Sequence, residues 1–229
     1  MKKITFPILA LGFFFTQCNA TSPNEKKETY DQLLKRVQTK RDSLGTAYKA
    51  ANENKKKDLI VEARNFVFTT ITKDIFDFWY GTPWDFNGTT KVPKQGKIAC
   101  GYFITTILQA GGFDIPRVAW AQLAAEAIVK KMTPDIKRFN NRPVSEVEDY
   151  IGGRDDGLYI VGLDCHVGFI YKKGSKIKFV HSNYYKKEEG VMSENLDTTN
   201  PLKDSKYRVI GRLLDDAMMK KWLMNEKME

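Results

Sequence analysis

The chain has few cysteines and histidines. Its 229 residues include three cysteines and two histidines, and one cysteine, Cys18, lies near the N-terminus. Only Cys100 and Cys165 lie further along the chain, so a disulfide framework is excluded and one bridge is the maximum. Two histidines without carboxylates at ligand spacing do not make a zinc site. The sequence therefore predicts no metal and no other cofactor.

The apolar run at the N-terminus is too short to cross a bilayer. Ile4–Phe15 follows Lys2–Lys3, and this order is typical of a signal peptide, which we place at residues 1–20. Cys18 is positioned as the lipidated cysteine of a bacterial lipoprotein, which predicts a membrane-anchored protein facing the periplasm or the cell surface. The alternative is cleavage after Ala20 and secretion to the periplasm.

Acidic residues are outnumbered by basic ones. The chain has 37 Lys and Arg against 28 Asp and Glu, a net charge of +9. Removal of the signal peptide takes away Lys2 and Lys3 and leaves about +7. Such a charge favours cell-wall carboxylates or acidic lipid head groups, and the alternative is a lysine-rich surface that only solubilises the protein. For an exported protein we expect no nucleic-acid partner, and we expect a monomer.

The segment before residue 80 has helical periodicity. Residues 22–29 are polar and are predicted to be a short tether. Apolar side chains then form one stripe over residues 30–48 and a second over residues 59–75, each at helical spacing. We therefore divide the mature chain into a tether with an N-terminal helical region, residues 21–79, and a second domain, residues 80–229.

The second domain changes from helical to β character along its length. Helices are predicted after Cys100 and over residues 120–132, and the residues between Pro134 and Pro143 are predicted to be a loop. Short runs rich in β-branched and aromatic residues predict strands at 158–163, 166–171, 176–182 and 207–213, before a terminal helix at 215–224. Helices followed by a small antiparallel sheet indicate an α+β fold.

Cys100 lies at a boundary between a loop and a helix. Glycine, proline and asparagine recur over residues 81–96 and predict a loop. The spacing of the apolar residues after Cys100 then predicts a helix that ends at Gly111–Gly112. The free amides and the positive dipole at a helix N-terminus favour a thiolate, which a nucleophile needs. The alternative interpretation is that Cys100 is a small buried apolar side chain.

The two histidines fall on neighbouring predicted strands. A two-residue turn at Gly174–Ser175 would pair Gly168 with His181 and put both imidazoles on one face. A three-residue turn would put them on opposite faces. Since neighbours in a strand point to opposite faces, Cys165 beside His166 is predicted to face into packing, with a structural role.

Four sequence blocks resemble a known family. P-W-D-F-N-G, P-x-x-G-x-I-A-C-G-Y-F, H-V-G-F-I and F-V-H-S occur in this order over about residues 80–213. They resemble the NlpC family of papain-like cell-wall cysteine peptidases. The resemblance implies a papain-like fold with Cys100 as nucleophile, His166 as base and His181 as the residue that orients the base. The family usually has Asp-Cys-Ser where this chain has Ala99–Gly101, and its loop before the cysteine is shorter, which leaves the substrate open.

The resemblance also implies an activity and a substrate. The expected reaction is hydrolysis of an amide bond in the peptide stem or cross-bridge of peptidoglycan by thiol acyl transfer. Trp84, Phe86 and Tyr102 are predicted to line the cleft, and Asp164 to bind a substrate amine. Two alternatives stay open: a transglutaminase-like or amidase variant of the same Cys–His chemistry, and a non-catalytic wall-binding lipoprotein that keeps the fold.

Overall fold

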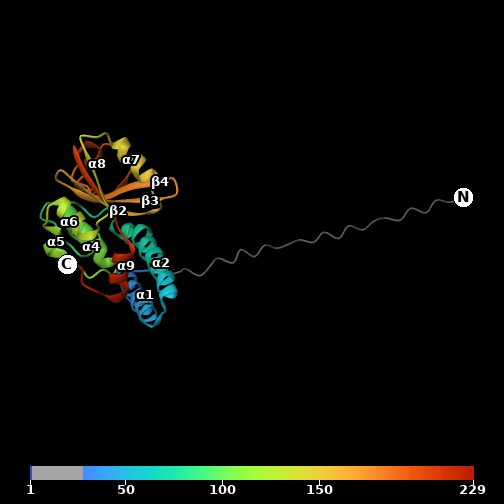
Figure 1. Cartoon of the computed structure of the whole chain (residues 1–229). Helices are drawn as coiled ribbons and strands as arrows, with labels where there is room; N and C mark the ends of the chain where they lie inside the picture. Colours follow the sequence, from blue (N-terminus) through green and yellow to red (C-terminus); the bar gives the residue numbers. More distant parts are fainter. Residues whose placement is uncertain (2–27) are drawn as a thin grey trace.

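Helices cover both faces of an antiparallel sheet (Figure 1). The computed structural model describes Met1 and residues 28–229, so the predicted signal peptide, Cys18 and most of the tether lie outside the described residues. Among the helices that the structure describes, none is long and apolar enough to cross a membrane. The described part of the chain is a mixed α+β structure, as the sequence predicts.

Two long helices precede the rest of the fold. Thr29 caps the first through a capping box, and the side chain of Asn52 caps the second by accepting from the backbone N–H of Lys55. The second helix continues through a π-helical turn into a short last segment. The bounds are α1 (Tyr30–Ala50), α2 (Glu53–Thr69), η1 (Thr70–Ile75) and α3 (Phe76–Trp79). These elements match the two helices that the apolar stripes predict.

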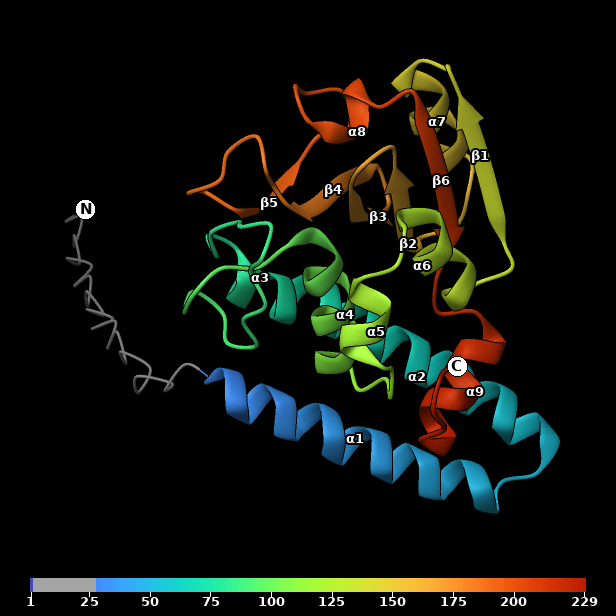
Figure 2. The same cartoon turned by 90° about the vertical axis from the view of Figure 1, so that its left-hand side faces the viewer.

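The N-terminal helices share one hydrophobic core with the rest of the structure. Leu33 and Ile71 belong to the same buried cluster as Phe103 and as Trp222 of α9 (Asp216–Met224). The indole N–H of Trp222 donates to the carbonyl of Gly111 at 2.8 Å. Figure 2 shows α1 and α2 beside α9. Residues 30–79 therefore share a hydrophobic core with the rest of the described structure.

The helices around Cys100 differ from the prediction in one place. The sequence predicts one helix over residues 120–132, and the structure has two, divided at residues 122–124. The bounds are α4 (Cys100–Ala110), α5 (Arg117–Ala121) and α6 (Ala125–Met132). A Cβ on Gly101 would collide with the backbone carbonyl of Ala121, so the end of α5 lies directly against the start of α4. This close approach places residues 122–124 beside Cys100.

The described residues contain a six-stranded antiparallel sheet in the order β1-β6-β2-β3-β4-β5. The bounds are β1 (Ile136–Asn140), β2 (Gly157–Leu163), β3 (Val167–Lys173), β4 (Lys176–Ser182), β5 (Val191–Glu194) and β6 (Tyr207–Arg212). Four of these strands match the prediction. The loop predicted between Pro134 and Pro143 is wrong in part, because it contains β1. This edge strand has only Phe139 buried, so it lacks the apolar pattern of a strand.

The two faces of the sheet are covered by different helices. Leu158 and Ile160 of β2 point into the core that α4, α6 and the N-terminal helices share. Tyr159 and Val161, which alternate with them, point toward α7 (Val144–Gly152) and α8 (Pro201–Asp204). Because both faces are buried, the central strands read as nearly continuous apolar runs.

The hairpin of β3 and β4 has the register that the sequence predicts. Lys173 pairs with Lys176 across the two-residue turn, in which Gly174 has a φ of 59°. The ladder runs to the pair Phe169 and Val180, and one further step brings Gly168 opposite His181. The prediction of a two-residue turn is confirmed.

Gly168→Ala should destabilise the fold, because a Cβ at this position would collide with the Phe179 ring and approach Cβ of His181 to 3.0 Å. The expected loss is about 1–3 kcal/mol in the free energy of unfolding, measured by urea denaturation. Gly152→Ala is the control, since a Cβ at Gly152 meets nothing within 4 Å. Equal stability of the two variants would contradict the close packing at Gly168.

Candidate active site

Cys100 is the first residue of α4, as predicted, and it is partly buried. Burial raises the pKa of the Cys100 thiol, and the backbone N–H groups of Val167, Gly101 and Cys100 itself oppose that rise in pKa. The expectation of a lowered pKa for this thiol is therefore wrong, although the amides at the helix terminus act in the expected direction. Desolvation outweighs the amides, so the resting form is the neutral thiol.

The two histidines contact each other directly. Nε2 of His166 lies 2.9 Å from Nδ1 of His181, with the rings nearly perpendicular at 85°. His166 directly precedes β3 and His181 belongs to β4, so the hairpin register sets their separation. Both side chains are buried, at 2% and 0% exposure. The prediction that the imidazoles share one face is confirmed.

Glu194 extends this pair to three side chains and was not among the predicted site residues. Nε2 of His181 lies 2.8 Å from Oε2 of Glu194, and Nδ2 of Asn183 donates to the same oxygen at 3.2 Å. Lys186 Nζ lies 3.8 Å from the other carboxylate oxygen. Glu194 ends the four-residue strand β5, diagonal to His181 across the β4–β5 ladder. The signal that was available is a carboxylate in a segment long enough to pair with β4.

Burial keeps both imidazoles neutral. It lowers the pKa of His166 well below its ordinary value, and the nearby His181 lowers that pKa further. Burial also lowers the pKa of His181, against the opposing effect of the Glu194 carboxylate. Nδ1 of His166 is buried and has no hydrogen-bond partner among the described residues. The site therefore rests as a neutral thiol beside a neutral imidazole with one unused ring nitrogen.

A cleft brings the predicted binding residues together with the cysteine and the histidine. Trp84, Phe86 and Tyr102 all line it with Cys100 and His166, and Phe86 is 78% exposed. The remaining lining residues are Asn87, Thr89, Ala99, Gly101, Ala121, Gln122, Leu123, Cys165 and Tyr184. The loop before α4, the break between α5 and α6, and the β2–β3 turn thus meet at Cys100.

Tyr184 is a second residue of the site that was not predicted from the sequence. It follows β4, and its ring centroid lies 5.1 Å from that of His166 and 5.9 Å from that of Trp84. Its ring therefore connects the imidazole with the aromatic side of the cleft.

Asp164 has a different role from the predicted one. Its two carboxylate oxygens accept from the backbone N–H groups of Lys206 and Tyr207, at 2.8 and 3.0 Å. These bonds fix the start of β6, so we assign Asp164 a structural role. It lines an adjoining hollow that shares Cys100 and His166 with the aromatic cleft, and it is not among the residues that line the aromatic cleft itself.

Cys165 does not face into packing, so that prediction is wrong. Its side chain is exposed and lines the cleft, with Sγ 3.9 Å from the Tyr184 hydroxyl. The reason is that residues 164–165 form a bend between β2 and β3, where strand alternation does not apply. Cys100 and Cys165 are both free thiols.

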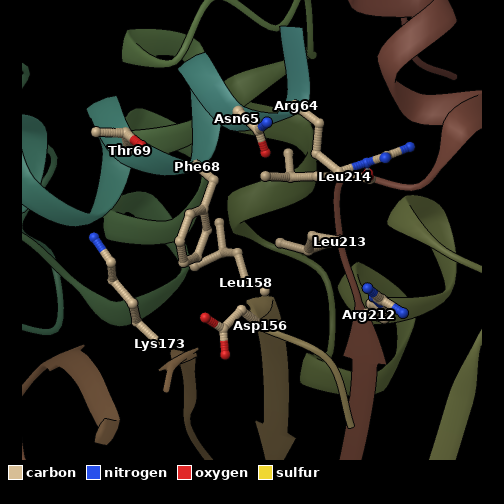
Figure 3. Close-up of a pocket in the computed structure, with 11 residues that line it drawn as sticks. Arg64, Asn65, Phe68, Thr69, Asp156, Leu158, Lys173, Arg212, Leu213 and Leu214 are labelled. Carbon is tan, nitrogen blue, oxygen red and sulfur yellow. Dashed lines mark hydrogen bonds between the residues drawn. The ribbon is translucent and has the colours of Figure 1, made fainter. Parts of the chain in front are cut away.

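Neither a metal site nor the other main pocket offers a competing centre. Across the described residues no group of three or more His, Cys, Asp or Glu side chains could hold a metal ion. A second pocket lies where β2 begins, at the opposite end of that strand from His166. Lys173 and Arg212 lie on opposite sides of Asp156 there and do not converge on one point (Figure 3).

Comparisons with protein-family models, with curated proteins and with solved structures found no match. The site is therefore interpreted from its own geometry and from the sequence blocks described above.

Alkylation of Cys100 should reach its half-maximal rate at a higher pH than alkylation of a free cysteine peptide, because burial favours the neutral thiol. The rate is measured by peptide mapping with mass spectrometry over a pH series. Cys165→Ser removes the second reactive thiol, and Cys100→Ser shows what Cys165 contributes. A midpoint below that of the free peptide would show that the helix terminus and the imidazole outweigh desolvation.

Proposed function

We propose that this protein is a papain-like cysteine hydrolase that cleaves an amide bond in cell-wall peptides. The observation that carries the proposal is the unpartnered Nδ1 of His166. His166 is buried and hydrogen-bonded to His181, and it lines the same cleft as Cys100. A buried nitrogen without a partner is unfavourable, and a role in catalysis would account for one held next to the cleft. The order of the sequence blocks, which resemble the NlpC family, supports the same assignment.

In the proposed mechanism His166 acts first as base and then as acid. Nδ1 of His166 takes the thiol proton, and Sγ of Cys100 attacks the carbonyl carbon of the amide. The backbone N–H of Cys100 stabilises the oxyanion. The imidazolium then gives its proton to the leaving nitrogen, the C–N bond breaks, and a thioester remains on Cys100. Water, deprotonated by His166, hydrolyses that thioester and restores the thiol.

The direction of the pKa shifts fits a base that acts during attack. A neutral His166 is available as a proton acceptor, because burial lowers its pKa. The thiol keeps its proton until attack, because burial raises the pKa of Cys100. The N–H groups of Val167 and Gly101 near the sulfur then favour the thiolate as it forms. The proton transfer therefore belongs to the reaction rather than to the resting enzyme.

The cell-wall substrate and the location rest on the sequence. The N-terminal residues have the order of a lipoprotein signal peptide, and the excess of basic residues suits a wall rich in carboxylates. We propose a protein anchored through Cys18 that acts on peptide stems or cross-bridges.

Digestion of purified muropeptides, with products identified by mass, tests the proposal. Cys100→Ala and His166→Ala should both abolish cleavage, because nucleophile and base are needed in every turnover. His181→Asn should keep part of the activity, because the asparagine oxygen can still accept from His166 Nε2, while His181→Ala should lose more.

Two outcomes would count against these assignments. An active His166→Ala with an inactive His181→Asn would show that the two roles are reversed. Binding of muropeptides without any cleavage by the wild type would instead support a non-catalytic wall-binding protein.

A further inference from the structure

The hydrogen-bonded row of side chains from His166 through His181 ends in the Glu194 carboxylate, which can only accept hydrogen bonds. An ionised carboxylate has no proton to donate, so the contact of 2.8 Å between Glu194 and His181 requires a proton on Nε2 of His181. The Glu194 side chain is 10% exposed, and Asn183 donates to the same carboxylate oxygen. These contacts fix the carboxylate as the acceptor for His181.

The proton on His181 Nε2 decides the state of the next ring. A neutral imidazole carries one proton, so Nδ1 of His181 is an acceptor. The contact of 2.9 Å then requires a proton on Nε2 of His166. Nδ1 of His166 is left without a proton, and this is the nitrogen that has no partner among the described residues. One carboxylate thus sets the protonation of two rings.

We propose that Glu194 is a positioning residue that holds both imidazoles in the tautomer with a free lone pair on Nδ1 of His166. This inference rests on the proposed function, since it explains why His166 is ready to accept the Cys100 proton. Glu194 does not touch the cleft, as it is absent from the lining residues, and it acts through His181.

Two substitutions at Glu194 distinguish the effect of its hydrogen-bond acceptor from the effect of its side-chain size. Glu194→Gln keeps an acceptor oxygen, and the donors on Asn183 and His181 both favour that oxygen at the position of Oε2. Glu194→Leu removes the acceptor, so His181 can move its proton to Nδ1 and donate to His166. Nδ1 of His166 then carries the proton and can no longer act as a base. Glu188→Gln, an exposed carboxylate in the neighbouring loop, is the matched control.

Nitrogen NMR of the untagged protein reads the tautomers directly. The chain has two histidines, so ¹⁵N-histidine labelling gives two ring systems to assign. We expect Nδ1 of His166 unprotonated and Nε2 protonated in the wild type, Glu188→Gln and Glu194→Gln. We expect the reverse in Glu194→Leu. A protonated Nδ1 in the wild type, or an unchanged tautomer in Glu194→Leu, would overturn the proposal.

The kinetics give a second readout. Glu194→Leu should lower kcat on the order of a hundredfold or more with little change in KM, since it disables the base and not the cleft. Glu194→Gln should lose about tenfold, and the acid limb of its pH profile should move to lower pH. The carboxylate raises the pKa of His181, and the hydrogen bond between His181 and His166 couples the protonation of the two rings. The other charged or titratable groups near His166, His181 and Glu194 are Lys186, Tyr184 and Cys100. The variants leave these groups unchanged.

Two further results are decisive. If Glu194→Leu does not fold, the wild-type tautomer and the acid limb of Glu194→Gln still decide the question, and an unmoved limb contradicts the proposal. If the wild type cleaves no muropeptide, the proposed function fails, while the NMR result still tests the role of Glu194.

A separate observation concerns the cleft itself, which contains no charged side chain among its fourteen described lining residues. At the chain's charged fraction of 28%, about four would be expected. Three charged groups near the cleft already have partners. Asp164 accepts from two backbone amides, and the Arg117 guanidinium donates to Thr106 and to two backbone carbonyls. Lys187 lies over the Trp84 ring.

We infer that the substrate segment held in the aromatic cleft, next to the scissile amide, is uncharged, with small or apolar residues and no free ammonium or carboxylate. This second inference also rests on the proposed function. A charge in a partly desolvated cleft needs a partner, and this lining has none to offer. Four aromatic rings instead present apolar surface to the segment: Trp84, Phe86, Tyr102 and Tyr184. Carboxylates elsewhere on the wall peptide would then lie outside the cleft.

Matched synthetic peptides test this inference. Each pair shares one sequence of small residues and differs only in a free or blocked terminus next to the scissile amide. The blocked peptide should be cleaved at least about tenfold faster, and should bind Cys100→Ala more tightly by a similar factor. Equal rates, or faster cleavage of the charged peptide, would overturn the inference. If neither peptide is cleaved, binding to Cys100→Ala still ranks them while the proposed function fails.

A new charge in the cleft gives the complementary result. Gln122→Glu introduces a carboxylate into the lining, and it should raise the relative rate on the peptide with a free ammonium, by a factor that falls as salt is added. Gln95→Glu is the matched control, because Gln95 is exposed and lies outside the lining. An identical preference in both variants would contradict a cleft that selects by charge.

Discussion

The position of Cys100 relative to the histidines depends on one buried hydrogen bond. Oγ of Ser182 donates to the carbonyl of Ile98 at 2.7 Å, and joins the end of β4 to the residue two places before Cys100. Ser182 adjoins His181, so one contact relates the strand that carries an imidazole to the helix that carries the thiol. Such a bond contributes only about 1 kcal/mol net, but its loss would leave two buried polar groups unpaired. The precision of the site therefore rests on the junction between loop and sheet.

Burial stabilises the fold and also sets the protonation of the buried thiol and imidazoles. The apolar cores on both faces of the sheet stabilise the fold. The same burial removes water from His166, His181 and the Cys100 thiol, and it favours their neutral forms. The fold tolerates the two imidazoles because they bond to each other and to Glu194, with the exception of one nitrogen of His166. In the proposed mechanism that nitrogen is the proton acceptor.

Local signals in the sequence predicted the parts of the site that depend on local geometry. The turn at Gly174–Ser175 fixes the hairpin register, and hence the shared face of the histidines. The loop-to-helix boundary fixes Cys100. The pKa of the thiol was not predictable, because desolvation is set by elements remote in sequence. Glu194 and Cys165 were missed for related reasons: one lies on a four-residue strand recognised only through its partner, and the other lies in a bend.

The packing of α9 against α1 and α2 has a consequence for how the chain acquires its structure. Gly45 of α1 contacts the backbone carbonyl of Leu223, and the Phe66 ring lies 6.2 Å from that of Trp222. The first helix that the structure describes therefore completes its core only when the last helix is in place. Contacts of such long sequence separation slow folding. Until the last helix packs, the apolar stripe of α1 stays exposed, and such exposed surface makes a folding intermediate prone to association.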